Sequence, residues 1–407
     1  MADSPTGGQL PSGVRLTALD PDFREDPYAV LAEVRRRAPT HFDSELGRLV
    51  VTDHDLVHDI LRHKEMWSDP RKGNPESFSQ FLLPPEGEEP SMLLMDDPDH
   101  KRLRSLVSSS FTPRAVEAWR PRVRAVVARV LAGLEGGEFD LIADFAGPVP
   151  TVVIAEMLGI DPGMQDDFKR WSDTSVKVAF NPFPGEEERA RAMAARQALN
   201  EFFHAEIGRR RQQPGDDLIS DMLRAEEAGE RLSEREIVTQ CNLLLIAGNV
   251  TTTDLIGNGV KALLDNPDQL RKLMSDPALL ENAVEEMLRF DSPVTNSGRI
   301  ANREVDFGGC PVHEGESLST SLAAANHDPD VYPQPASFDI TREDTHHQSF
   351  GGGRHLCLGA HLARIEAQEA ILGLLAHFPV LRMSDRGYIY ASVPSFRGMS
   401  ECWVTTR

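Results

Sequence analysis

The stretch "SFGGGRHLCLGAHLARIEAQ", residues 349–368, sets a single cysteine between a glycine run and an amphipathic helical pattern. Glycines let the backbone take turns that other residues avoid and approach a ligand closely. The helix should end before Pro379, because proline interrupts a helix interior. Cys357 is therefore expected at a helix N-terminus, where the helix dipole and free amide N–H groups favour the thiolate over the thiol.

A thiolate in this position has three chemical uses, as a nucleophile, a redox sensor or a metal ligand. His355 lies two residues away and keeps the nucleophile open, since such a group needs a base. Packing in the core is a further possibility, because buried cysteines are common, but the flanking glycines argue against it.

Composition excludes several classes of protein. The chain of 407 residues is long enough for one large domain or two packed ones. Its net charge of −21 argues against a nucleic-acid partner and for a soluble protein. The N-terminus lacks the apolar core of a signal peptide, and no apolar run is long enough to span a bilayer. Four scattered cysteines without a CxxC pair favour reduced thiols in the cytoplasm.

Hydrophobic periodicity predicts a mainly α fold with a minor β part. Long helical patterns dominate from Asp97 onward, whereas "GRLVVTDHDLV" indicates a strand followed by a helix. Residues 302–326 predict short strands, and residues 320–355 predict an ordered but irregular segment. We expect a flexible tail over residues 1–18 and a single domain over residues 19–407.

Two helix starts carry local signals. Ser233 and Glu236 have the spacing of a capping box at the start of a long central helix. Asp97 is expected to cap the helix that begins at Pro98, since proline suits a first helical turn.

The cysteine loop carries a family signature. It fits the pattern Phe-Gly-x-Gly-x-His/Arg-x-Cys-x-Gly, so the chain resembles the cytochrome P-450 superfamily, in its soluble bacterial branch, from about residue 20 to the end. The resemblance implies a helix-rich, triangular single domain around a buried haem b (iron protoporphyrin IX), with the cysteine as the iron ligand. The matching positions are Phe350, Gly351, Gly353, His355, Cys357 and Gly359.

Further motifs follow in the order that this family has them. "EEMLR" supplies Glu286 and Arg289, and "PASFDITR" supplies Arg342. The resemblance implies that these three side chains form a buried network that fixes the loop of the cysteine. In isolation, the first two would be an ordinary surface ion pair.

Four basic residues resemble the partners of the haem propionates in this family. His100 and Arg104 lie four residues apart, hence on one helix face, and point to one propionate. Arg299 and His355 resemble the partners of the other. Charge-assisted bonds of this kind contribute about 1.5–3 kcal/mol each.

The segment "LLLIAGNVTTTDLIGNG" resembles the central helix that lines the oxygen site. Ala247 and Gly248 are expected to form a groove for dioxygen. Thr251, followed by Thr252, matches the threonine that bonds the bound oxygen or its water. The family usually has an acid directly before that threonine, whereas this chain has Val250.

Loss of a positioned acid typically costs about 10²–10⁴-fold in rate, so protons need another route. Asp254, three residues past Thr251, is one candidate, although a solvated or capping aspartate is the more common role. Asn249, Thr252, ordered water or a polar substrate group are the others.

The resemblance implies a monooxygenase that hydroxylates a small hydrophobic molecule with O2 and two electrons. The sequence contains no flavin or iron–sulfur module, so a ferredoxin and its reductase are the expected partners of a monomeric enzyme. A basic patch near the cysteine would attract an acidic ferredoxin. Its candidate residues are Lys101, Arg102, Arg114, Arg354 and Arg364.

Substrate contacts are expected above the haem and are mainly apolar. The candidates are Phe78, Phe81, Leu82, Val178, Phe180, Leu244, Ala247, Val294, Asn296, Ser395 and Phe396.

Other functions stay open at this point. A nitric oxide-reducing branch of the family also has Ala-Gly-Asn without the acid, and peroxide-driven members depart at the same place. A non-enzymatic haem sensor is the alternative of another class, although it would have no use for the threonine-rich oxygen groove.

Overall fold

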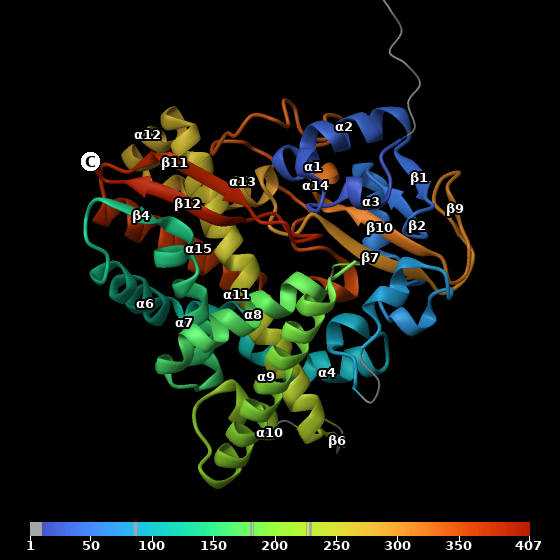
Figure 1. Ribbon diagram of the computed structural model, residues 1–407, viewed down its shortest axis with the longest axis horizontal. Helices are drawn as coiled ribbons and strands as arrows, with labels where there is room; N and C mark the ends of the chain where they lie inside the picture. Colours follow the sequence, from blue (N-terminus) through green and yellow to red (C-terminus); the bar gives the residue numbers. More distant parts are fainter. Residues whose placement is uncertain (1–9, 85–87, 180, 182, 225, 228–229) are drawn as a thin grey trace, which may run out of the picture.

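The computed structural model describes residues 10–84, 88–179, 181, 183–224, 226–227 and 230–407. Figure 1 shows a roughly triangular molecule in which helices fill the lower corner and much of the left side, a smaller sheet lies at the upper left, and the largest sheet lies at the upper right. The mainly α architecture agrees with the sequence-based expectation. Within the described residues, no helix is both long enough and apolar enough to cross a membrane.

Helix α11 (Glu234–Asp265) runs through the centre of the molecule and packs most extensively against five other helices. Its N-terminus has the expected capping box, in which the Ser233 hydroxyl accepts from the amide of Glu236 and the Glu236 carboxylate accepts from the amide of Ser233. Apolar residues surround this helix on most sides, as suits a buried element. Its neighbours are α7 (Pro148–Leu158), α8 (Gln165–Ala179), α9 (Glu186–Gln212), α13 (Leu280–Phe290) and α15 (Ala360–His377).

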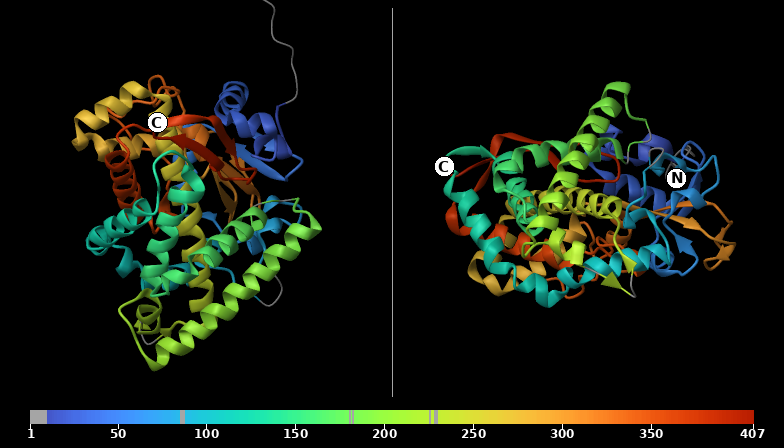
Figure 2. Two further views of the ribbon diagram at one scale, coloured as in Figure 1. Left: turned by 60° about the vertical axis from the view of Figure 1, so that its left-hand side comes forward. Right: turned by 90° about the horizontal axis from the view of Figure 1, so that it is seen from below.

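The remaining helices cover the outside. Figure 2 shows α9 as a long rod at the edge of the molecule, in front of the helical core in the left view. The other α-helices are α1 (Pro21–Glu25), α2 (Pro27–Arg37), α3 (His54–Arg62), α4 (Asp99–Ser108), α5 (Pro113–Glu117), α6 (Arg120–Ala132), α10 (Leu218–Arg224), α12 (Pro267–Ser275) and α14 (Leu322–Asn326).

The largest sheet has the strand order β1-β2-β10-β7-β3, in which only β2 and β10 run parallel. A second sheet has the order β11-β12-β4, and two hairpins complete the β part. The strands are β1 (Thr40–Asp43), β2 (Arg48–Val51), β3 (Met66–Trp67), β4 (Glu138–Asp140), β5 (Glu226–Glu227), β6 (Glu230–Arg231), β7 (Asn296–Ala301), β8 (Val305–Asp306), β9 (Pro311–Val312), β10 (Ser317–Ser321), β11 (Arg382–Tyr390) and β12 (Met399–Thr405).

Two local expectations were wrong. Helix α4 begins at Asp99, and Asp97 accepts no capping bond from it; the Asp97 carboxylate lies 3.4 Å from Arg354 Nη1 instead. The packed part of the chain also begins before residue 19, because Leu16 and Ala18 are buried and the amide of Gly13 donates to Asp43. Residues 1–9 of the expected tail lie outside the described part.

The irregular segment that follows α14 is ordered, as expected, and carries the chain to the cysteine loop. Its course depends on side-chain contacts rather than on a sheet or helix, since residues 327–352 contain no regular element. This segment therefore has to be fixed by the elements against which it packs.

Candidate active site

One cavity of about 400 Å³ reaches from the cysteine loop to the largest sheet. Its walls come from α11, the start of α15, the cysteine loop, strands β7 and β10, and the segments around residues 78–82 and 92–94. Apolar side chains predominate, and a few charged groups stand among them. These are Arg48, His100, Arg104, Arg299, His355 and Glu366, together with the thiol of Cys357.

The cysteine loop turns sharply into this cavity. Gly351 and Gly353 have positive φ angles of 69° and 63°, a conformation that side chains with a Cβ disfavour. At Gly353 a Cβ would also lie 2.5 Å from the carbonyl oxygen of Leu61. The amide of Cys357 donates to the carbonyl of Phe350, and α15 begins three residues later at Ala360 with Gly359 as its N-cap.

The thiol of Cys357 opens into the cavity and is exposed there in the protein without haem. Burial raises its pKa, while the amide of Gly359 and the positive charges of Arg104 and Arg364 act in the opposite direction. The burial effect is the larger one in this structure. A metal ion bound to the sulfur would reverse the balance, since coordination deprotonates a thiol outright.

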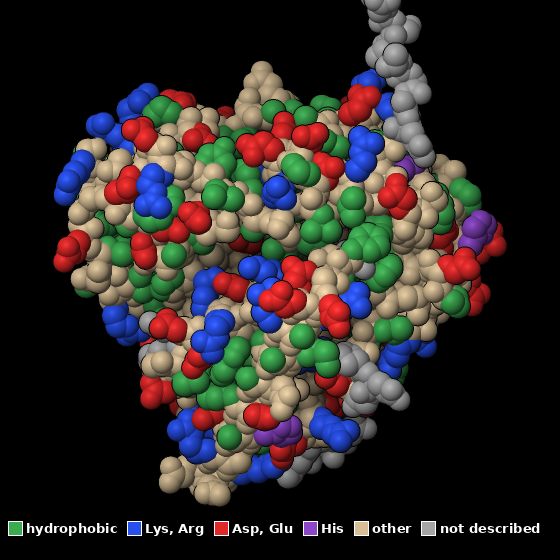
Figure 3. Space-filling view, in the orientation of Figure 1, with side chains coloured by type: hydrophobic (Ala, Val, Ile, Leu, Met, Phe, Trp, Pro, Cys, Tyr) green, Lys and Arg blue, Asp and Glu red, His purple; other side chains and the backbone are tan. Residues whose placement is uncertain are grey.

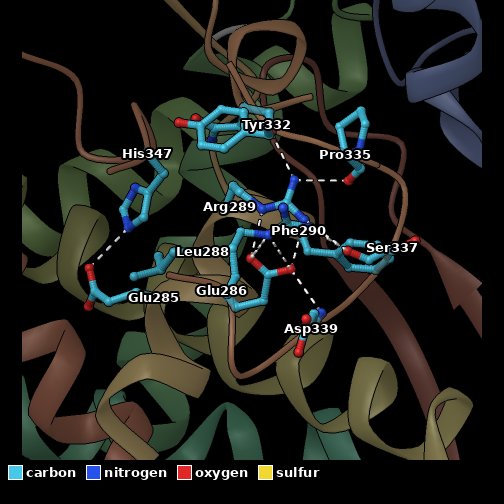
Figure 4. A network of polar contacts seen from close by, with 12 residues as sticks. Glu285, Glu286, Leu288, Arg289, Phe290, Tyr332, Pro335, Ser337, Asp339 and His347 are labelled. Atoms are coloured by element: carbon cyan, nitrogen blue, oxygen red, sulfur yellow. Dashed lines mark hydrogen bonds and ion pairs between the residues drawn. The ribbon is translucent and has the colours of Figure 1, made fainter. Parts of the chain in front are cut away.

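The Glu286–Arg289–Arg342 triad fixes the irregular segment. Figure 4 shows Glu286 and Arg289 together with Pro335 and Ser337 of that segment. Glu286 and Arg289 are both fully buried and bond through Nε–Oε2 at 2.7 Å and Nη2–Oε1 at 2.8 Å. Arg342 Nε donates to Glu286 Oε2 at 3.1 Å. Arg289 also donates to the backbone carbonyls of Asn326, Pro335 and Ser337. The structure thus brings the three expected residues together and ties α13 to the segment before the cysteine.

A second carboxylate anchors the start of α15. Glu285 accepts from Arg364 at 2.6 and 2.7 Å and lies 3.2 Å from His347 Nε2. Burial alone would raise the pKa of Glu285, but the bonds from Arg364 and His347 lower it to about 2. The Arg364 guanidinium also stacks over the Phe350 ring at 4.5 Å. Sequence analysis had not found this contact.

The four expected basic residues all reach the cavity. His100 and His355 stand ring to ring, with centroids 4.2 Å apart, and the Nε2 atom of each lacks a hydrogen-bond partner among the described residues. His355 Nε2 is 3.9 Å from Asp96 Oδ1, too far for a hydrogen bond. Burial, followed by the charge of His355, lowers the pKa of His100 to about 4.

The two arginines of this group, Arg299 and Arg104, donate hydrogen bonds to protein groups next to the cavity. Arg299 is 5% exposed and donates to Ser297 Oγ and the carbonyl of Gly298. Burial lowers its pKa to about 10. Arg104 donates to the carbonyl of Leu356, next to the cysteine. Buried cations and unpartnered imidazole nitrogens facing one cavity are suited to anionic oxygens.

Helix α11 forms the opposite wall. Ala247, Gly248, Thr251 and Thr252 line the cavity, as expected. The Thr251 hydroxyl donates to the carbonyl of Ala247 at 2.7 Å. Ala247 and Gly248 are small and leave space in the cavity beside the two threonines.

Of the three residues considered for the proton route, Thr252 lines this cavity, whereas Asn249 and Asp254 do not. Asn249 faces α7, where its Oδ1 accepts from the Thr151 hydroxyl. Asp254 is buried against the C-terminal part of the chain: a Cβ on Gly398 would lie 1.8 Å from Asp254 Oδ1. The expectation that Asp254 serves this wall was wrong, because its side chain fills the space that Gly398 leaves. Val250 is also absent from the lining.

Most expected substrate contacts line the cavity. Three do not. Phe81 is 51% exposed and packs edge-on against Phe183, so its ring lies outside. Val178 does not face the cavity, whereas Val176, in the same last turns of α8, does. Phe180 lies outside the described residues. The residues found in the lining are Phe78, Leu82, Leu244, Ala247, Val294, Asn296, Ser395 and Phe396.

Two charged residues of the cavity were missed. Arg48 on β2 is 4% exposed, and Glu366 on α15 is 2% exposed with Oε2 unpartnered among the described residues. Burial raises the pKa of Glu366 to about 8. A charged residue within the apolar pattern of α15 was an available signal for Glu366. The four-residue strand around Arg48 carried no such signal.

Comparison with known proteins defines the class. The sequence model of the cytochrome P450 family matches residues 24–388, and the chain belongs to this family. Its cofactor is haem, iron protoporphyrin IX bound through a thiolate, and the chain is an oxidoreductase of the monooxygenase type.

Several proteins of similar sequence come from bacteria. The chain is 42% identical to a vitamin D(3) 25-hydroxylase of Pseudonocardia autotrophica over 94% of each sequence. It is 46% identical to cytochrome P450 107B1 of Saccharopolyspora erythraea over 72% of this chain and 71% of the relative. Among solved structures, myxobacterial CYP267B1 in complex with myristic acid superposes with a TM-score of 0.88 at 35% identity, covering 96% of this chain and 98% of that chain.

The residues present fit a haem. Its two propionates are carboxylates, and the cavity offers the unpartnered nitrogens of His100 and His355 with the cations of Arg104 and Arg299. The sulfur of Cys357 opens into the same space. Gly359 has nothing within 4 Å of where a Cβ would stand, so the wall next to the cysteine is flat enough for a macrocycle.

Proposed function

We propose that this cytochrome P450 hydroxylates a small hydrophobic organic molecule, using O2 and two electrons from an external ferredoxin and ferredoxin reductase. The proposal includes a monomeric enzyme in the cytoplasm. The observation that carries it is the single cavity that combines Cys357, the Thr251–Thr252 pair and an extended apolar wall. Relatives named as hydroxylases, of vitamin D(3) and of 6-deoxyerythronolide B, support the reaction type.

Bound haem supplies oxygen activation, and the protein supplies position, charge and dryness. With haem bound, Cys357 would ligate the iron and donate electron density to it. His100, Arg104, Arg299 and His355 would hold the propionates. These bonds would give the unpartnered Nε2 atoms of the two histidines an acceptor and the two arginines an anionic partner.

The α11 wall serves the reacting end of the substrate. Thr251 and Thr252 present hydroxyls, which can accept and donate a proton in turn. Ala247 and Gly248 keep the neighbouring space free. The apolar contacts from Phe78, Leu244, Val294 and Phe396 exclude water and hold a hydrophobic body.

The external supply of electrons is part of the proposal, since proteins of this family typically use redox partners. The proposed basic patch is partly neutralised: Arg102 pairs with Glu236, Arg354 with Asp97 and Arg364 with Glu285. A ferredoxin surface would have to compete with these carboxylates. Lys101 and Arg114 are the other two members of the patch.

The test is turnover by the purified, haem-loaded protein with a ferredoxin and its reductase, on a library of hydrophobic compounds preselected by the spin-state shift that follows loss of iron-bound water. Hydroxylated product with NADPH consumption supports the proposal. Because neither Val250 nor Asn249 supplies an acid, two outcomes would replace it: direct reduction of nitric oxide by reduced nicotinamide, or turnover only with peroxide. Ligand binding without any turnover would indicate a haem sensor.

A further inference from the structure

The far end of the cavity holds a cation that the haem does not account for. Arg48 lines the cavity from β2, and its side chain is 4% exposed. Strand register places it apart from Arg299: Leu49 and Arg299 both pair with Leu318, and Arg48, one residue before Leu49, points to the other face of the sheet. The two arginines therefore serve different parts of the cavity.

The guanidinium of Arg48 is only partly compensated. Its Nε donates to Asp43 Oδ2 over a long 3.4 Å, and no acceptor in the described part of the chain bonds its two terminal nitrogens. Asp43 is engaged elsewhere as well, because its Oδ1 accepts from the amides of Gly13, Glu45 and Leu46. Burial lowers the pKa of Arg48 more than Asp43 raises it, so this ion pair compensates the buried cation only in part.

The surroundings of Arg48 are polar in an otherwise apolar cavity. Ser79 and Ser317 line the wall beside it, and the Ser79 amide donates to the Ser317 hydroxyl at 3.4 Å. On the other side, the Phe78 ring lies 4.9 Å from the guanidinium carbon. The ring and the ion pair with Asp43 hold the guanidinium in one orientation, which lowers the entropy lost when it binds a ligand.

We propose that Arg48, with the hydroxyls of Ser79 and Ser317, binds the carboxylate of the substrate, so that the substrate is an apolar molecule with an acid group at the end remote from the haem. This inference rests on the proposed function, since it concerns the same cavity. Two free N–H groups in a fixed fork match the two oxygens of a carboxylate. The apolar walls accept the rest of the molecule.

The test uses the haem-loaded protein and a matched pair of probes, tetradecanoic acid and its methyl ester, titrated by the spin-state shift. The native protein should bind the acid more tightly. Arg48→Gln should weaken the acid about 10- to 100-fold and leave the ester within about twofold, in line with loss of a charge-assisted contact. Arg48→Lys should retain part of the preference, since it keeps the charge but loses the fork.

Removal of Arg48 leaves Asp43 buried without a counter-charge, so the variant Asp43→Asn/Arg48→Gln is made in parallel. It should show the same loss of acid preference with a normal carbonyl spectrum. Equal weakening of acid and ester would assign Arg48 to structure and overturn the inference, as would an unchanged ratio. If the native protein took up no haem, the proposed function itself would be wrong. Failure of the proposed function can therefore be distinguished from failure of the inference about Arg48.

A second measurement determines the position at which the product is hydroxylated. If the carboxylate is anchored, homologous acids should be hydroxylated at a constant number of carbons from the carboxyl group. Hydroxylation at a constant number of carbons from the methyl end would contradict the inference while leaving the proposed hydroxylase intact.

Discussion

Glu286 and Arg289 form an ion pair in which neither side chain is exposed, with both carboxylate oxygens bonded to the guanidinium. The remaining N–H groups of Arg289 hold the backbone carbonyl of Asn326, at the end of α14, and those of Pro335 and Ser337 in the segment that leads to Cys357. Because removal of one partner leaves an uncompensated buried charge, the pair is costly to break. The cysteine loop thus owes its position to an ion pair on a neighbouring helix.

Glu286→Gln should lower the free energy of unfolding by about 3–5 kcal/mol and reduce haem content. Denaturant unfolding and the haem-to-protein ratio measure both. Glu33→Gln is the matched control, since Glu33 and Arg36 have the same spacing but are exposed. That control should change stability by about 0–1 kcal/mol. Equal effects at the two sites would remove the triad from its proposed role.

Gly353→Ala should destabilise the cysteine loop. The positive φ costs a residue with a Cβ about 1–2 kcal/mol, and the collision with the Leu61 carbonyl adds to this cost. Unfolding by denaturant and retention of haem on gel filtration check the result. Gly208→Ala, within α9 and with open space around its Cβ, should instead gain up to about 1 kcal/mol. A neutral Gly353→Ala would contradict this description of the loop.

Thr251→Val removes a hydroxyl from the cavity wall with little change of shape. We expect less product per electron and more hydrogen peroxide, since a group able to pass a proton is lost. Thr253→Val is the control, because the Thr253 hydroxyl makes the same type of bond, to the carbonyl of Asn249, but faces away from the cavity. The ratio of product to NADPH consumed is the measurement. If both variants change it equally, the wall assignment fails.

Glu366 should make stability fall with rising pH. The pKa of Glu366 is about 8 in the folded protein and near 4.5 in the unfolded chain. The folded state therefore binds more protons than the unfolded state between pH 4.5 and 8. The free energy of unfolding then decreases across this range, by up to about 1.4 kcal/mol per pH unit. Glu366→Gln does not titrate and should show a shallower decline between pH 5 and 8. Parallel curves for the two proteins would contradict the burial of this carboxyl.

Local sequence patterns predicted much of the site. The glycine pattern around Cys357, the Glu-x-x-Arg spacing and the small residues of α11 each predicted a position that the structure brings to the cavity or its support. These signals work because each depends on neighbours within about ten residues: turn conformation, helix periodicity or capping.

The rest depends on contacts between distant segments. Asp254 turns toward Gly398, more than a hundred residues away, and no local pattern shows that this glycine leaves space there. Arg48 reaches the cavity only because β2 pairs with β10, which follows it by more than 250 residues. Val176 and Val178 lie on opposite faces because they are two residues apart in a helix, but which of them faces the cavity depends on how α8 packs. The charge of the chain did not help to predict where the site lies. Figure 3 shows acidic and basic side chains interspersed over this face, without one dominant patch.

The bond between Cys357 and the haem iron is tested most directly by the absorption spectrum of the reduced protein with carbon monoxide. We expect a Soret band shifted to the red position that only a thiolate ligand produces, lost in Cys357→Ser and retained in Cys310→Ser. Native protein that is free of haem, or whose band lies where nitrogen-ligated haem absorbs, would contradict the account.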